Sequence, residues 1–150
     1  MTVTRRQMMQ AAAWSGAVGL AISAPRDACS KEKTSSSQPM LLQIYFQVAP
    51  QLAADFERNY TESYVPALRK QDGYLRSNLL RLFPEQTAQE IEAATTEFNY
   101  QMELVFDTEE NRRKWVASAE HTHAWPLTAE MAGKVAWRGF DIVGKDQNSR

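Results

Sequence analysis

In four stretches of the chain, apolar residues are interspersed with polar ones close to the period of two that is typical of half-buried β-strands. The alternation is clearest over residues 98–106, where every second residue is apolar. The other predicted strands span residues 41–48, 74–83 and 135–143. Because successive side chains of a strand point to opposite faces, each stretch offers one face to a core.

Between the first two strands, the apolar residues repeat at helical spacing. They recur every four positions over residues 51–70, at Leu52, Phe56, Tyr60, Tyr64 and Leu68. Pro66 falls inside this helix and is expected to kink it or break it locally. Gly73 follows the helix and is suited to a left-handed cap.

A second helix is predicted after the third strand. Asp107 and Glu110 fit a capping box, which predicts that the helix begins at residue 107. Its inward residues are expected to be Trp115, Val116, Ala119 and either Thr122 or His123. Pro126 is expected to end or bend this helix, and Gly133 to cap the turn that follows.

The resulting order βαββαβ predicts an α+β fold of the ferredoxin-like type, a four-stranded antiparallel sheet with two helices on one face. Residues 85–97 form a longer acidic connection, with a helical turn expected around Ile91. If Leu42 and Phe98 face the helices, the open face carries Gln43, Tyr45, Gln47, Asn99, Gln101 and Glu103. An open face that bears a tyrosine is a candidate for pairing with a second copy of the chain.

The first 29 residues have the pattern of an export signal. Arg5 and Arg6 precede an uncharged stretch of small and apolar residues over 11–24, which is too short to span a bilayer as a helix. The paired arginines resemble the twin-arginine (Tat) motif and predict export to the periplasm. The alternative is an ordinary amphipathic helix with a chance arginine pair.

The end of this leader has two interpretations. Cys29 follows a small residue, as a lipoprotein signal requires, and its lipidation would place the protein at a membrane surface. Cleavage near residues 23–24 by an ordinary signal peptidase is the alternative. In either case residues 30–40 are a polar linker, residues 41–144 the domain and residues 145–150 a tail.

Composition narrows the classes of function. The 17 Lys and Arg residues nearly balance the 18 Asp and Glu residues, so the net charge of −1 gives no electrostatic reason to bind nucleic acid. A single cysteine cannot form an internal disulfide or a cysteine-based zinc site. The sequence also contains no P-loop, dinucleotide-binding, zincin or serine-hydrolase motif.

Two stretches share a pattern with a known group of proteins. The first, residues 64–75, contains Pro66, Arg69, Gly73 and Tyr74; the second, residues 106–110, is followed by Trp115, Ser118 and His121 or His123. They resemble, respectively, the helix-to-strand junction and the second helix of antibiotic-biosynthesis-monooxygenase-like domains in the dimeric α+β barrel superfamily. The resemblance covers about residues 41–144 and implies a homodimer with a pocket between the sheet and the helices of each subunit.

The resemblance also implies two functions. The first is cofactor-independent monooxygenation of a small aromatic or quinone-like compound, and the second is binding of haem or a hydrophobic small molecule without turnover. Haem-degrading members use a second-helix His, a first-strand Asn and a Trp near the end of the third strand. Here the first strand has no Asn, and Phe106 stands closest to the Trp position. A third possibility is an interaction module whose own side chains fill the pocket.

The candidate site residues follow from this resemblance and from their places on the predicted elements. The candidate catalytic residues are His121, His123 and Trp115, and the candidate substrate-binding residues are Tyr45, Tyr60, Tyr64, Phe106 and Trp125. His121 and His123 lie about 200° apart around a helix, so only one can face a given pocket. Trp115 and Tyr60 also fit ordinary core positions, whereas Trp125 and Trp137 suit a planar aromatic ligand or a dimer contact.

Overall fold

A computed structural model describes residues 38–146 of the chain. The predicted export signal, with Arg5, Arg6 and Cys29, lies outside the described residues. Within 38–146, no helix is long and apolar enough to cross a membrane.

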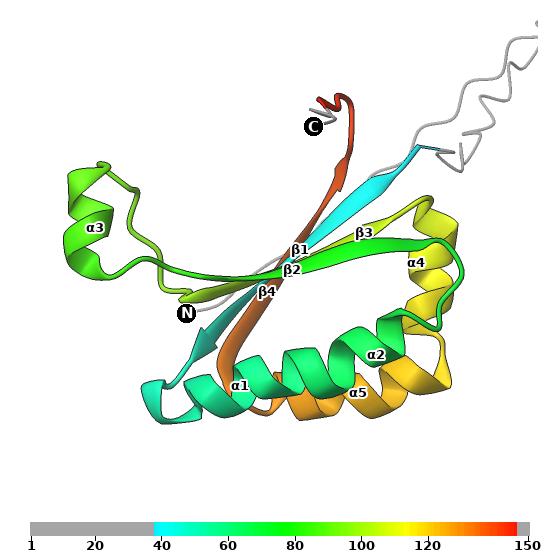
Figure 1. Ribbon diagram of the computed structural model, residues 1–150, viewed down its shortest axis with the longest axis horizontal. Coiled ribbons are helices and arrows are strands. Elements are labelled where there is room, and N and C mark those ends of the chain that lie inside the picture. The colour runs from blue at the N-terminus through cyan, green and yellow to red at the C-terminus, as the bar shows by residue number, and fades with distance from the viewer. Residues whose placement is uncertain (1–37, 147–150) are drawn as a thin grey trace, which may run out of the picture. The chain divides into compact units, whose positions relative to one another are not determined.

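Four antiparallel strands form one sheet in the order β2-β3-β1-β4 (Figure 1). The strands are β1 Met40–Val48, β2 Tyr74–Arg81, β3 Tyr100–Phe106 and β4 Ala132–Asp141. The predicted ferredoxin-like α+β fold is therefore confirmed. The prediction for the start of the last strand was wrong, because Ala132 already pairs with Val48 beyond an irregularity in β1, which places Gly133 inside β4.

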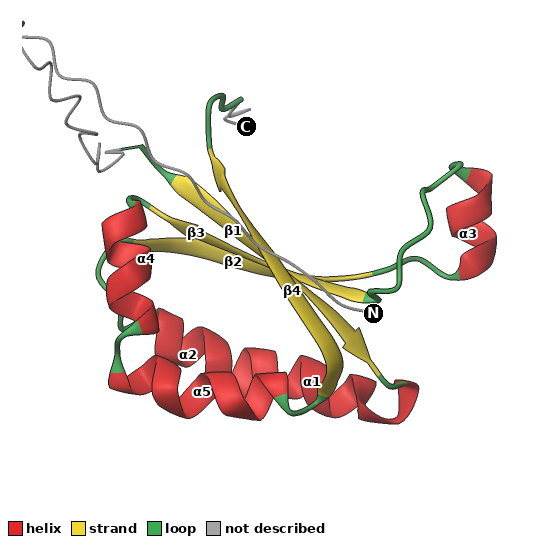
Figure 2. Ribbon diagram, turned by 180° about the vertical axis from the view of Figure 1, so that it is seen from behind, coloured by secondary structure: helices red, strands yellow, loops and turns green. Residues whose placement is uncertain are grey.

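All helices except α3 pack on one side of this sheet (Figure 2). The first helical region consists of η1 Pro50–Leu52, α1 Ala53–Asn59, η2 Tyr60–Tyr64 and α2 Val65–Leu68. The predicted disruption near Pro66 is present as the wider π-helical turn η2, in which the Val65 N–H donates to the Tyr60 carbonyl five residues earlier. Proline disfavours regular α-helix at this point because its ring clashes with the carbonyl four residues before it.

The second helical region is two helices rather than one. Helix α4 spans Glu109–Val116 and helix α5 spans Ala119–Ala129. Ser118 separates them because its side chain caps α5, and the sequence analysis missed this second start. Pro126 lies inside α5, so of the two predicted effects, an end or a bend of the helix, the end was wrong.

The predicted capping box at Asp107 was displaced by one residue. Thr108 is the N-cap of α4, and its hydroxyl accepts the Asn111 N–H at 3.2 Å. The Asp107 carboxylate instead accepts the Asn111 side-chain amide at 2.8 Å. Asp107 has this role because it lies against Gly73, whose carbonyl accepts the Asp107 N–H at 2.8 Å. Gly73 itself has a φ of 72°, as expected for a left-handed cap.

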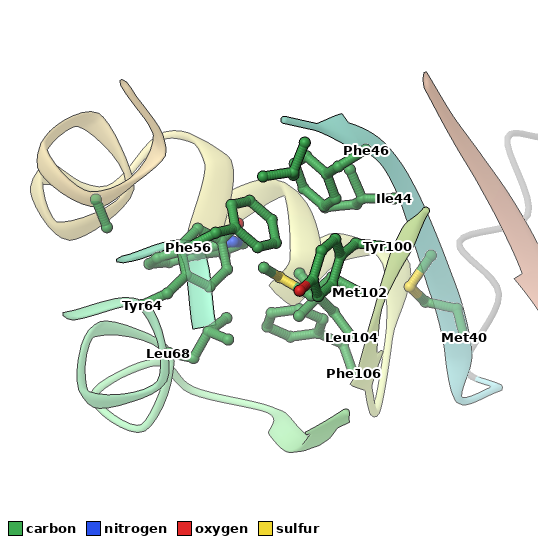
Figure 3. Close-up of a cluster of buried hydrophobic side chains, with 13 residues drawn as sticks. Met40, Ile44, Phe46, Phe56, Tyr64, Leu68, Tyr100, Met102, Leu104 and Phe106 are labelled. Atoms are coloured by element: carbon green, nitrogen blue, oxygen red, sulfur yellow. The ribbon is translucent and has the colours of Figure 1, made fainter. Parts of the chain in front are cut away.

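The core lies between the sheet and the helix layer (Figure 3). Alternate residues of β1 and β3 face it, including Ile44, Phe46, Met102 and Leu104. Phe46 meets Phe56 of α1 edge to face, with ring centroids 5.0 Å apart. The period-two pattern of the sequence therefore identified the buried face correctly, with even-numbered residues of both central strands pointing inward.

Among residues 38–146, no helix covers the other face of the sheet (Figure 2). Glu103 lies near its centre, where its carboxylate accepts side-chain amides of Gln43 at 3.2 Å, Gln101 at 3.1 Å and Asn78 at 3.3 Å. The remaining helix, α3 Glu85–Glu90, lies in the connection between β2 and β3 and extends away from the rest of the domain (Figure 1). It ends just before Ile91, close to the predicted helical turn.

Candidate functional site

A cavity of about 260 Å³ lies between the sheet and helices α4 and α5. Three strands, the π-helical turn and both of these helices contribute to its wall. The lining residues are Leu42, Ile44, Tyr64, Leu104, Arg112, Trp115, Val116, His121, Trp125 and Trp137. Small-molecule sites usually start at about 300 Å³, so this cavity suits a compound of one or two rings.

His121 is held between two tryptophans. Its ring meets Trp115 edge to face with centroids 4.9 Å apart, and it lies nearly parallel to Trp125, at 8°, with centroids 5.8 Å apart. The second contact follows from spacing, because residues four apart in α5 lie on the same helix face. His121 therefore has a defined orientation in the cavity wall.

Ser118 fixes the backbone on which His121 stands. Its Oγ accepts the His121 N–H at 3.1 Å and donates to the Trp115 carbonyl at 2.7 Å. One side chain thus connects the last turn of α4 to the first turn of α5. The relative position of Trp115 and His121 depends on this connection.

Burial lowers the pKa of His121 below its ordinary value, and the nearby positive charge of Arg112 lowers it further. Both effects favour the neutral imidazole. A neutral imidazole at neutral pH has a lone pair that can accept a proton from a bound ligand. His121 therefore has the protonation state of a general base.

Tyr64 and Trp115 form the innermost part of the wall. Each residue is 1% exposed, and their rings meet edge to face with centroids 5.7 Å apart. Burial raises the pKa of the Tyr64 phenol, so this residue is neutral at physiological pH. Both residues belong to the core and line the cavity at once.

The structure brings together some of the predicted site residues and separates others. His121, Trp115, Tyr64 and Trp125 line the cavity, as does Trp137, which is 65% exposed at its rim. The predicted residues that do not line it are His123, Tyr45, Tyr60 and Phe106.

Each of these four residues lies in a different part of the fold from the cavity. His123 is exposed on α5, consistent with the expected angle between it and His121. Tyr45 is on the open face of the sheet, where its hydroxyl donates to Gln43 at 2.6 Å. The Tyr60 hydroxyl is 2.8 Å from Ser77 Oγ, and Phe106 is fully buried in the core. The geometry gives these residues no contact with a ligand in the cavity.

Five lining residues were not predicted as site residues: Arg112 and the apolar Leu42, Ile44, Leu104 and Val116. Arg112 is part of a run of charged residues at salt-bridge spacing, a pattern that normally indicates a solvated helix face. The available signal was its position three residues before Trp115, which puts both side chains on one face of α4.

The residues present do not fit a haem. A porphyrin with its four pyrrole rings is larger than the cavity of about 260 Å³. Among residues 38–146 there is also no cluster of three or more side chains suited to binding a metal ion.

No protein-family model matches the sequence, and no curated protein sequence matches it either. Solved structures do share its fold. SnoaB from Streptomyces nogalater, a cofactor-independent oxygenase crystallised as a point mutant, superimposes with a TM-score of 0.56 at 15% identity, covering 72% of this chain and 96% of SnoaB.

Two further structures give similar values. A candidate antibiotic biosynthesis monooxygenase from Caulobacter crescentus has a TM-score of 0.55 and 16% identity, covering 71% of this chain and 92% of its own. A dimeric ferredoxin-like protein of unknown function from Thermobifida fusca has a TM-score of 0.55 and 10% identity, covering 70% and 92%. At these identities the likeness establishes the fold, and the chemistry has to be argued from the site.

Proposed function

We propose that the protein is a cofactor-independent monooxygenase that acts on a small aromatic or quinone-like compound in the cavity beside His121. The single observation that carries this proposal is a neutral, oriented imidazole in the wall of an aromatic cavity. The shared fold with SnoaB, a cofactor-independent oxygenase, supports the reaction class.

The reaction balances without an external reductant. A phenol whose para carbon bears a hydrogen takes up one oxygen atom of O2 at that carbon and becomes a quinone. The second oxygen atom leaves as water with the two hydrogens lost from the ring carbon and the hydroxyl group. The substrate supplies all the electrons.

The residues of the cavity supply proton transfer and position. His121 accepts the phenol proton, which makes the ring electron-rich enough to react with O2, and returns a proton to the oxygen that leaves as water. Trp125 and Trp137 offer aromatic surface for the substrate ring. Leu42, Ile44 and Leu104 form an apolar floor that limits water at the reacting carbon.

Oxygen uptake by the purified protein tests the proposal. A panel of phenols and 1-naphthols whose para carbon bears a hydrogen is added to the wild-type protein and to the variants His121→Gln and His123→Gln. We expect uptake with at least one compound, its loss in His121→Gln and its retention in His123→Gln, because His121 lines the cavity and His123 does not. No uptake across the panel, or equal uptake by His121→Gln, would contradict the proposal.

The alternative is a binding protein that holds a hydrophobic small molecule without turnover, which the apolar cavity also supports. Tight binding of an aromatic compound with no oxygen uptake would select this function. The third expectation, a module whose own side chains fill the space, is not supported by a cavity of about 260 Å³.

We also propose that the protein is exported and works as a homodimer. The paired residues Arg5 and Arg6 support export, and Cys29 remains a candidate for lipidation. The open sheet face and the shared fold with a dimeric ferredoxin-like protein support the homodimer. Replacement of both arginines by lysine should retain the full chain in the cytoplasm; unchanged export would contradict the twin-arginine assignment.

A further inference from the structure

Among the described residues that line the cavity, Arg112 has the one permanently charged side chain. The other nine lining residues are apolar, aromatic or, in the case of His121, mostly neutral. The Arg112 side chain is only 20% exposed, although arginine normally reaches into solvent. A buried cation in an otherwise apolar wall requires a partner.

Glu109 is the partner within the chain. Arg112 donates from Nε and Nη2 to the two oxygens of this carboxylate, both at 2.7 Å. An ion pair between residues three apart on one helix is common, and by itself it would assign Arg112 a purely structural role. The charges around Glu109 indicate that Arg112 has a second role besides this structural one.

Glu109 is shared by two arginines. Arg113 also donates to it, from Nε at 3.0 Å, so two guanidinium groups face one carboxylate and a net charge of +1 remains. The hydrogen bonds of Arg112 within the described residues use two of its five N–H donors. The Arg113 side chain is 57% exposed, so solvent screens its charge, whereas Arg112 lines the cavity.

Arg112 therefore keeps three N–H donors that Glu109 does not use, on a side chain that lines the cavity. Electrostatic attraction is stronger in an apolar, water-poor site than in bulk water, and guanidinium binds carboxylates with directed hydrogen bonds. The tryptophans of the same cavity offer surface for an aromatic ring. One cation and several aromatic faces in one small cavity match a ligand that is both aromatic and anionic.

We infer that the cavity selects a one- or two-ring aromatic compound bearing an anionic group such as a carboxylate, and that Arg112 binds that group. This rests on the proposed function only in placing the ligand in this cavity. Arg112 is then the residue that determines specificity, while His121 carries the proton.

A pair of probes that differ only in charge tests the inference by calorimetric titration. The probes are 2-naphthoate and its neutral amide, 2-naphthamide. We expect the full-length protein to bind 2-naphthoate at least tenfold more tightly, and this preference to be lost in Arg112→Gln and largely kept in Arg112→Lys. Arg113→Gln is the matched control, because Arg113 shares the same carboxylate but does not line the cavity, and it should keep the preference.

The outcomes separate this inference from the proposed function. Equal binding of the two probes, or a preference that survives Arg112→Gln, would overturn the inference and leave the oxygenase proposal standing. Binding of neither probe would overturn the inference, and the oxygenase proposal would still be decided by the oxygen-uptake panel. If Arg112→Gln does not fold, the Arg112 Nη–H resonances of the wild-type protein should shift on addition of 2-naphthoate and not of 2-naphthamide; no difference between the probes would overturn the inference.

Discussion

Ser118 should control the chemistry of the cavity through His121, although it does not line the cavity itself. In Ser118→Ala, the first turn of α5 loses the acceptor for the His121 N–H, and the Trp115 carbonyl loses its hydroxyl donor. Removing an N-cap of this kind costs about 1 kcal/mol of stability. For a domain of this size, that corresponds to a fall in Tm of roughly 4–8 °C.

The loss of the cap should also change the titration of His121. The pKa of this residue is lowered mainly by burial, and a frayed first turn exposes the ring to water. We therefore expect the pKa of His121 in Ser118→Ala to rise toward the ordinary histidine value. An NMR pH titration of the imidazole resonances measures this directly, with the exposed His123 as an internal reference.

Thr108 provides a matched control. Its hydroxyl caps α4 in the same way, accepting the Asn111 N–H at 3.2 Å, and also donates one hydrogen bond, to Asp107. Thr108→Ala should lose a similar amount of stability in urea denaturation without an equal change at His121. The reasoning fails if the two variants shift the His121 titration equally, or if Ser118→Ala leaves it unchanged.

Three other predictions concern stability and assembly. Because the pKa of His121 is lowered in the folded state, the folded protein binds fewer protons than the unfolded protein, and stability should fall as the pH drops below about 6.5. Urea denaturation at several pH values between about 5.5 and 7.5 measures this dependence. The variant His121→Asn should reduce it, and His123→Asn should leave it unchanged. Gly73→Ala should lower the free energy of unfolding in urea denaturation by at least about 1–2 kcal/mol, the usual cost of a left-handed residue with a Cβ, because that Cβ would also meet the Asp107 carboxylate. An unchanged free energy of unfolding would contradict the structure. Leu80→Lys on the open sheet face should convert the proposed dimer to a monomer, as measured by light scattering. Leu127 on α5 is equally exposed, and Leu127→Lys should leave the dimer intact. A monomeric wild-type protein would refute the dimer.

The sequence predicted the sheet and its buried face well because strand patterning is local. In β3 the alternation of Tyr100, Met102 and Leu104 with polar residues is the same signal that the sheet uses to separate core from solvent. The glycine at position 73 was equally predictable, because the requirement for a positive φ is a property of a single residue.

Helix boundaries were less predictable because competing signals lie side by side. Asp107, Thr108 and Ser118 are all good N-caps, and tertiary contacts decide between them. Asp107 packs against Gly73 and does not cap α4, and Thr108 is the N-cap of this helix. Pro126 remains inside α5, where the sequence predicted an end or a bend of the helix.

The residues that line the cavity were predicted in part. His121, Trp115, Tyr64 and Trp125 were identified as candidates, but the sequence could not decide between His121 and His123. That choice depends on where α5 begins, which Ser118 fixes. Arg112 was missed because a charged residue with a helical ion-pair partner is usually solvent-facing, and only the position of α4 against the sheet shows that its side chain borders a cavity.

The most direct test of the central claim is a reaction under isotopically labelled oxygen. The wild-type protein is incubated under ¹⁸O2 with a naphthol that supported oxygen uptake, and the quinone product is analysed by mass spectrometry. We predict one ¹⁸O atom per quinone molecule with the wild type and none above background with His121→Gln. Incorporation of oxygen from water instead of from O2, or equal labelling by the variant, would contradict monooxygenation at the His121 cavity.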